Sequence, residues 1–375
     1  MAEAVIAGYV RSPFTFAGKG ELAGLRPDVL AARVVRELLR RTGVDANHLE
    51  DLILGCAFPE GEQGLNLGRV VGTLADLPDS VAGMTVNRWC GSSMQAIQDA
   101  AGAIASGAGE AFLCGGVEAM SRVPMMGLNC LPPPDWSPAT RSAFLNMGLT
   151  AETVAERFGI PRTRQDEYAA ESQARAAKAQ AEGRFDDEIV AIGDVPKDGC
   201  VRAGTTAEKL STLKTVFKEN GSVSAGNSSP LTDGAAMTLV CSDSYAAAHG
   251  LPVMARIRAF AVSGCAPEVM GIGPVEASRK AMARAGIGAP DLDVVEMNEA
   301  FAAQVLACCD QLGIDPMSIN RDGGAIAIGH PLGATGARLV GKAALQLNQG
   351  AGRWALATQC IGGGQGIAMV LEKAP

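Results

Sequence analysis

The chain has 375 residues, of which 47% are hydrophobic and only 4% are aromatic, and its formal net charge is −8. This length exceeds one ordinary hydrophobic core and predicts two or three domains. The negative net charge argues against a nucleic-acid-binding protein, and an anionic substrate would need a local basic patch.

Other features of the sequence concern the cellular compartment. No apolar run reaches the ~20 residues that a membrane helix needs, and the first residues lack the basic segment and cleavage site of a signal peptide. The ten cysteines are scattered, without a C-x-x-C pair, which is typical of free thiols in a reducing compartment. We therefore expect a cytoplasmic protein without membrane insertion and without a metal site.

The first 120 residues alternate between short apolar runs and segments with helical periodicity. Strands are predicted at residues 4–8, 51–56, 81–89 and 111–114, and helices at residues 26–42 and over the stretch with Met94, Ile97, Ala101 and Ile104. This alternation predicts a parallel sheet with helices on both faces.

The composition changes near Ser121, and residues 121–230 are richer in Pro, Gly and charge. A long polar helix is predicted at residues 164–182, with Thr163 as its N-cap and Gly183 just after its end. We interpret this segment as an excursion from the sheet.

From about residue 252 the alternation returns and resembles the first part of the chain. A strand-like run at residues 326–329 precedes His330, a helix is predicted at residues 334–346, and a strand at residues 355–360 ends on Cys360. Two similar halves that meet face to face would bring Cys90 and His330 to one central crevice.

Three reactive side chains stand at tight turns. Cys90 lies at a strand-to-helix junction, where the helix N–H groups and dipole favour the thiolate, although a small buried core thiol is an equal alternative. His330, one of three histidines, stands between Gly329 and Pro331, a backbone that suits an imidazole exposed to a ligand better than a core residue. Cys360 precedes three glycines, which either admit a ligand or only form a turn.

Two further polar residues lie where a strand meets a helix. Asn298 is either an N-cap or an amide that fixes a water or an oxyanion. Glu299, its neighbour, is either a buried acid or a dimer contact.

The segments around Cys90, Asn298, His330 and Cys360 together closely resemble the thiolase family. The matching stretches extend over nearly the whole chain, at residues 87–96, 147–152, 224–227, 298–302, 323–336 and 360–366. The resemblance implies an α/β fold in which two similar halves form a five-layer αβαβα body with an inserted loop domain. The N-terminal half would comprise residues 1–119 and 231–253, the loop domain residues 120–230, and the C-terminal half residues 254–375.

The resemblance also implies a role for each residue of the motifs. Cys90 would be the acylated nucleophile and His330 its base, while Cys360 would move protons to and from the acetyl-CoA enolate and CoA. Asn298 would hold a water that forms one oxyanion hole with His330. The backbone N–H groups of Cys90 and Gly362 would form the other. The expected reaction is the CoA-dependent cleavage of 3-ketoacyl-CoA, or its reverse.

Contacts to the CoA substrate are implied in the same way, and no bound cofactor is expected. Arg202 matches a family arginine near the nucleotide, although a solvated surface charge is an alternative. The residues that match the pantetheine path are Met147, Ala225, Ser229 and Met270.

Departures from the family pattern bear on the substrate and the assembly. Asn146 stands where short-chain biosynthetic thiolases usually have His, and the residues after Cys90 are more like degradative 3-ketoacyl-CoA thiolases of bacterial β-oxidation. The segment between Ser121 and Asn146 is shorter than in tetrameric members. We therefore expect a degradative enzyme that forms a homodimer or a dimer of dimers, with a hydratase/dehydrogenase subunit as a further possible partner.

Four alternatives remain at this point. The first is an acetyl-CoA acetyltransferase, which would synthesise acetoacetyl-CoA. A decarboxylating condensing enzyme of the same superfamily would pair the nucleophile with His-His or His-Asn, and Cys360 argues against it. A non-catalytic thiolase-like lipid carrier would lack one or more of the four reactive residues. A Cys–His hydrolase would need a third orienting acid, which the sequence does not offer.

Overall fold

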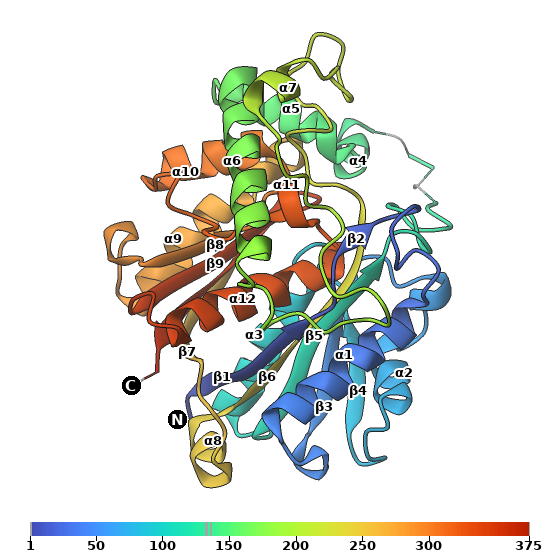
Figure 1. Cartoon of the computed structure of the whole chain (residues 1–375), viewed down its shortest axis with the longest axis vertical. Coiled ribbons are helices and arrows are strands. Elements are labelled where there is room, and N and C mark those ends of the chain that lie inside the picture. The colour runs from blue at the N-terminus through green and yellow to red at the C-terminus, as the bar shows by residue number, and fades with distance from the viewer. Residues whose placement is uncertain (1, 132–133, 136, 375) are drawn as a thin grey trace.

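A computed structural model describes residues 2–131, 134–135 and 137–374 (Figure 1). The described strands form one hydrogen-bonded path in the order β4-β3-β5-β6-β1-β7-β10-β9-β8, with β2 paired to β6. The strands are β1 (Ala4–Arg11), β2 (Thr15–Phe16), β3 (Asp51–Gly55), β4 (Ala82–Val86), β5 (Ala111–Ala119), β6 (Thr232–Ser242), β7 (Ala255–Gly264), β8 (Val294–Met297), β9 (Trp354–Ile361) and β10 (Gln365–Lys373).

The parallel pairing predicted for the first 120 residues is found between β3, β4 and β5, but the later strands β6, β7 and β10 pair antiparallel. β3 pairs in parallel with β4 and β5, and β8 with β9, but β6 runs antiparallel to β5 and β1, and β10 runs antiparallel to β7 and β9. The connection from β9 to β10 is a tight turn, and two strands joined in that way can pair only as antiparallel neighbours.

Helices and sheets alternate in five layers, as the sequence predicted. The two halves of the strand path touch only through Val5 and Ile6 of β1, which pair with β7. Helices α3 (Ser92–Ser106) and α12 (Leu332–Asn348) pack between the halves, α1 (Pro27–Thr42) and α2 (Leu67–Leu74) cover one outer face, and α9 (Gly273–Ala285) and α10 (Ala302–Leu312) cover the other (Figure 1). Three large apolar clusters fill the spaces between these layers.

Residues 120–230 contribute helices and no strand of the main sheet among their described residues. These helices are α4 (Pro138–Ala143), α5 (Met147–Arg157), α6 (Arg162–Ala181) and α7 (Ala207–Ser211), and α6 packs against α10 and α11 (Ala325–Ile328). The division of the chain into three domains stays a prediction. No helix in the described ranges is long and apolar enough to cross a bilayer.

Local corrections concern residues next to the candidate site. Helix α6 begins directly after Pro161, whose fixed φ suits a helix start, so Thr163 is not its N-cap. Residues 326–329 are not a strand, because α11 ends at Gly329, where φ is +105°. His330 precedes α12 by two residues.

The remaining described elements connect these layers. They are the short helix α8 (Asp243–His249) and the single helical turns η1 (Ala46–His48), η2 (Gly61–Gln63), η3 (Pro267–Ile272) and η4 (Ala289–Asp291).

Candidate active site

A cavity of about 440 Å³ lies where the starts of α3 and α12 meet the turn between β9 and β10. Nine of the ten residues proposed from the sequence line this cavity, and Asn298 lies behind it against His330. The nine are Cys90, Met147, Arg202, Ala225, Ser229, Met270, His330, Cys360 and Gly362.

Cys90 lies in a strained turn before α3. Trp89 has a φ of +43°, which is rare for a bulky residue, and a turn with hydrogen bonds from the N–H groups of Gly91 and Ser92 follows. The backbone N–H groups of Gly362 and of Cys90 itself lie within hydrogen-bonding reach of the sulfur and lower its pKa.

The predicted preference of Cys90 for the thiolate is wrong. Cys90 is half-buried by its accessible surface, but desolvation of its sulfur raises the pKa of the thiol to about 12, and this effect outweighs the backbone N–H groups. Desolvation disfavours the charged form of an acid. Cys90 is therefore a neutral thiol at rest, and it would need a base to act as a nucleophile.

His330 is buried and held by polar contacts on both ring nitrogens. Nδ1 lies 2.6 Å from Oγ1 of Thr335, whose hydroxyl donates to the carbonyl of Pro331, so Nδ1–H donates to Thr335. Nε2 lies 3.3 Å from Nδ2 of Asn298. Burial and the nearby charge of Arg338 lower the pKa of His330 to about 3. The imidazole is neutral, and its basic nitrogen is Nε2.

Asn298 is fixed from the sheet rather than from a helix. Its backbone N–H donates to the carbonyl of Thr358 at 2.9 Å, and α10 begins only at Ala302, so Asn298 is not an N-cap. Its amide is buried, and within the described residues Oδ1 has no hydrogen-bond partner. The amide therefore has capacity for one further polar group.

Cys360 stands one residue before the end of β9, opposite Cys90. Its thiol is buried, and burial together with the charge of Cys90 raises its pKa. The glycine turn that follows is shaped by Trp89: Gly363 has a φ of +75°, and a Cβ there would lie 2.5 Å from the Trp89 ring. Glycine at this position lets the turn approach the nucleophile.

Comparison with known proteins identifies the family. The model for the thiolase N-terminal domain matches residues 4–244, and the model for the thiolase C-terminal domain matches residues 251–373. The chain belongs to the thiolase family. It is 45% identical to a 3-ketoacyl-CoA thiolase of Bacillus subtilis, over 99% of this chain and 100% of that protein.

Two further relatives are similarly close. A β-ketoadipyl-CoA thiolase of Escherichia coli is 44% identical, with both chains covered completely. The crystal structure of an acetyl-CoA acetyltransferase of Bacillus anthracis superimposes with a TM-score of 0.92 at 37% identity, over 100% of this chain and 99% of that one.

Three residues of this thiolase site were missed by the sequence analysis. The Gln359 amide donates to the Cys90 carbonyl oxygen, and Thr335 orients His330. Glu118 is buried beneath Cys90, and its charge raises the pKa of that thiol. Of the three, only Glu118 could have been noticed in the sequence. It is a single acid near the end of an apolar strand, and burying a carboxyl group there is costly unless it has hydrogen-bond partners.

Glu299 is a buried acid with partners in its own chain, so its hydrogen bonds favour that alternative over a dimer contact. It accepts hydrogen bonds from Tyr168 and Ser172 of α6, at 2.8 and 2.7 Å, and from Asn320 at 2.8 Å. The residue next to Asn298 thus ties helix α6 to the C-terminal half of the thiolase fold.

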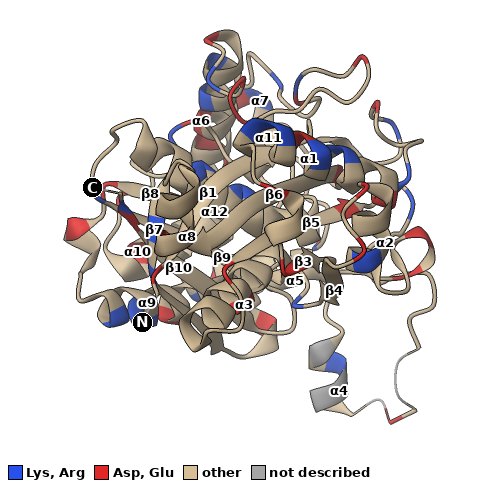
Figure 2. Ribbon diagram, turned by 90° about the horizontal axis from the view of Figure 1, so that it is seen from below, with Lys and Arg blue, Asp and Glu red and all other residues tan. Residues whose placement is uncertain are grey.

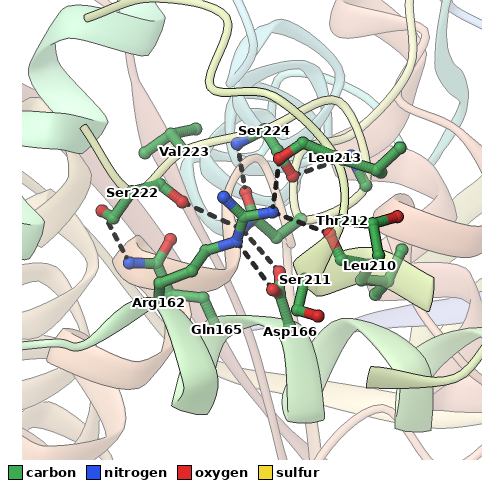
Figure 3. Close-up of polar contacts among 12 residues, drawn as sticks. Arg162, Gln165, Asp166, Leu210, Ser211, Thr212, Leu213, Ser222, Val223 and Ser224 are labelled. Atoms are coloured by element: carbon green, nitrogen blue, oxygen red, sulfur yellow. Dashed lines mark hydrogen bonds and ion pairs between the residues drawn. The ribbon is translucent and has the colours of Figure 1, made fainter. Parts of the chain in front are cut away.

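Arg162 of α6 holds the segment that carries Val216 and Phe217 along one side of the cavity, here called the roof. Its guanidinium pairs with Asp166 at 2.7 Å and donates to the carbonyls of Leu210 and Leu213 at 2.7 and 3.1 Å (Figure 3). Gln165 donates to the hydroxyl of Ser222 at 2.9 Å. These contacts fasten both ends of the segment that brings Val216 and Phe217 to the cavity.

Proposed function

We propose that the chain catalyses the CoA-dependent cleavage of 3-ketoacyl-CoA to acetyl-CoA and an acyl-CoA that is two carbons shorter. One observation carries this proposal: two thiols and a neutral imidazole line the same apolar cavity. Relatives that are named 3-ketoacyl-CoA thiolases and are 45% identical over the whole length support it. CoA takes part as a substrate.

In the first half-reaction Cys90 attacks the C3 carbonyl of the substrate. The proton of its thiol passes to Nε2 of His330 as the bond from sulfur to C3 forms, so that no free thiolate has to form first. The C2–C3 bond then breaks, which leaves an acyl thioester on Cys90 and the enolate of acetyl-CoA. Cys360 donates its S–H proton to C2 of the enolate.

In the second half-reaction the Cys360 thiolate takes the proton of the incoming CoA thiol. The CoA sulfur attacks the thioester on Cys90, and acyl-CoA leaves. Cys90 recovers its proton from His330. The N–H groups of Cys90 and Gly362 stabilise the oxyanion of the acyl-enzyme, and a water on Asn298 joins His330 in stabilising the enolate oxygen.

The pantetheine arm of CoA follows Met147, Ala225, Ser229 and Met270. Arg202 is exposed, and its guanidinium lies 5.1 Å from the centroid of the Phe16 ring. A planar cation at the rim of the cavity suits a phosphate or an adenine.

A second candidate function is the synthesis of acetoacetyl-CoA from two acetyl-CoA molecules. The similarity to the acetyl-CoA acetyltransferase structure favours it. It uses the same residues in the reverse direction, with Cys360 removing a proton from the methyl carbon of the second acetyl-CoA.

Thiolysis assays with 3-ketoacyl-CoA substrates of four to sixteen carbons test this function. Cys90→Ala should lose at least about 1000-fold in kcat, about 4 kcal/mol of barrier, and should form no acyl adduct in intact-protein mass spectrometry. Cys360→Ala should lose activity to a similar extent. An unmodified Cys90 after incubation with acyl-CoA would instead favour the lipid carrier, and product release without CoA would favour the hydrolase.

We further infer that this enzyme is a cytoplasmic homodimer that serves β-oxidation, with a hydratase/dehydrogenase subunit as a candidate partner. The edge strand β4 supports the dimer: its residues carry no charge, and β3 is its only neighbour in the described sheet (Figure 2). Uncovered, uncharged edge strands invite pairing with another chain. Light scattering after gel filtration should give twice the mass of the chain, and Met84→Lys should lower it.

A further inference from the structure

Two apolar walls meet at the reacting thiols. The first, here called the Cys360 wall, contains Met147, Phe217, Met270 and Phe301, which cluster with Cys360. The second, the Cys90 wall, contains Met120 and Leu332, which cluster with Cys90, and Met125 and Leu231, which line the same cavity.

The chemistry of the proposed function assigns each wall to one end of the substrate. Cys360 must reach C2 and Cys90 must bond to C3. Because C1 carries the CoA sulfur, the pantetheine arm leaves along the Cys360 wall. The chain beyond C3 must therefore leave along the Cys90 wall.

The Cys360 wall leads toward cations, which suits the phosphates of CoA. Val216 and Phe217 line both the cavity and a neighbouring hollow, which is also lined by Lys214 and Lys218 and by one acid, Glu219. Lys218 pairs with Glu156, and both side chains are partly exposed.

The Cys90 wall has no cation among its described residues. Of the described side chains around the whole cavity, Arg202 alone is a lysine or arginine, and it is exposed at the rim beside Phe16. The residues whose side chains are not described are Met, Pro, Trp, Ala and Thr, so none of them adds a cation.

A buried carboxyl group lies against this wall, and the nearest cations, Lys19 and Arg202, lie at the rim over the Phe16 ring. Glu118 is fully buried, and it accepts from the N–H groups of Ala57, Phe58 and Gly333 at 2.8, 3.2 and 3.0 Å and from the Gln63 amide at 2.8 Å. Burial raises the pKa of Glu118, and the four N–H donors around its carboxyl group oppose that shift. A substrate carboxylate brought to the inner part of this wall would find no lysine or arginine among the residues that form it, because Arg202 and Lys19 lie at the rim.

The apolar character continues beyond the cavity. Met125 is 37% exposed, and Met126, Leu128 and Leu131 follow at 44%, 58% and 80%. Apolar side chains this exposed are uncommon on a soluble surface unless they have a partner, and a long acyl chain would cover them.

We propose, on the basis of the proposed function, that the substrates are 3-ketoacyl-CoA molecules with an uncharged, apolar distal end and that a terminal carboxylate is rejected. Sequence identity does not make this distinction, because relatives named for 3-ketoacyl-CoA and for β-ketoadipyl-CoA are 45% and 44% identical to this chain. The Cys90 wall distinguishes the two kinds of substrate, because burying an unpaired carboxylate against it is costly.

The test compares 3-oxohexanoyl-CoA with 3-oxoadipyl-CoA, which share six acyl carbons and differ at C6. We expect kcat/KM for thiolysis to be on the order of 100-fold or more in favour of the uncharged substrate. Equal values, or a preference for 3-oxoadipyl-CoA, would overturn the inference while leaving the proposed function intact. Cleavage of neither substrate, nor of any other 3-ketoacyl-CoA, would overturn both.

Two matched variants test the assignment of the wall. Met125→Arg should raise the relative kcat/KM for 3-oxoadipyl-CoA at least tenfold above that of Met125→Gln, which has a polar side chain without charge. An unchanged ratio would put the distal end of the acyl chain elsewhere and overturn the assignment. A selective loss of 3-oxoadipyl-CoA cleavage in Arg202→Gln would also overturn it, because Arg202 would then be the carboxylate receptor.

Discussion

His330 and Thr335 are joined by a hydrogen bond of 2.6 Å from Nδ1 to Oγ1. Thr335 lies in the first turn of α12, five residues after His330, and its hydroxyl also donates to the carbonyl of Pro331. One hydroxyl therefore selects the tautomer in which Nδ1 carries the proton. Nε2, which faces Asn298, is then unprotonated. In the proposed mechanism this choice makes the imidazole a base without a charged partner.

Thr335→Val should lower kcat of thiolysis by about 10- to 100-fold with little change in KM. Valine keeps the shape and removes the acceptor, which leaves Nδ1–H unpaired in a buried site at a cost of about 1–3 kcal/mol. Thr335→Ser restores the hydroxyl and should recover most of the activity. Equal kcat for the valine and serine variants would show that the hydroxyl does not orient His330.

The rate of alkylation of Cys90 should keep rising with pH up to pH 10. Burial raises its pKa to about 12, so the thiolate fraction is small at neutral pH and grows about tenfold per pH unit. Mass spectrometry of the Cys90 peptide after iodoacetamide treatment should show this slope from pH 7 to 10. Glutathione, with an ordinary thiol, should level off near pH 9. A plateau for Cys90 below pH 9 would contradict a neutral, desolvated thiol.

Gly363→Ala should damage both stability and activity. Alanine at a φ of +75° costs about 1–2 kcal/mol, and its Cβ would lie 2.5 Å from the Trp89 ring, so the turn after Cys360 must shift. We expect kcat to fall at least tenfold. Gly286→Ala is the matched control: its φ is +72° and nothing lies within 4 Å, so it should lower stability to a similar extent and leave kcat unchanged.

Local signals predicted the alternating strands and helices and the turns that carry the site, while the five layers followed from the resemblance to the thiolase family. The apolar periodicity of α1 and α3 and the Gly-flanked turns at His330 and Cys360 are properties of short segments. These segments also match the family motifs, and this match linked residues that are 240 and more positions apart.

The antiparallel pairing of the later strands and the protonation states were beyond reach, because they depend on distant partners. The apolar sequence of β6 does not indicate in which direction the strand runs. Its antiparallel pairing with β5 and β1 is seen only in the sheet. The turn at Cys90 indicates helix N–H groups near the sulfur but not the extent of burial, which decides the sign of its pKa shift. Gln359 carries no local signal, since its partner Cys90 lies in a distant segment. Thr335 carries none either, since its contact with His330 depends on the geometry of the turn between them.

Arg162→Gln should loosen the roof of the cavity and weaken CoA binding more than the chemical step. The guanidinium holds the carbonyls of Leu210 and Leu213, and glutamine cannot reach both while pairing with Asp166. We expect KM for CoA to rise about tenfold, with kcat within threefold, and limited proteolysis to cut residues 204–221 faster. Arg164→Gln is the control on the same helix, because its ion pair with Asp310 is partly exposed and contributes at most about 1 kcal/mol. If both variants behave alike, the hydrogen bonds drawn in Figure 3 do not hold the roof closed over CoA.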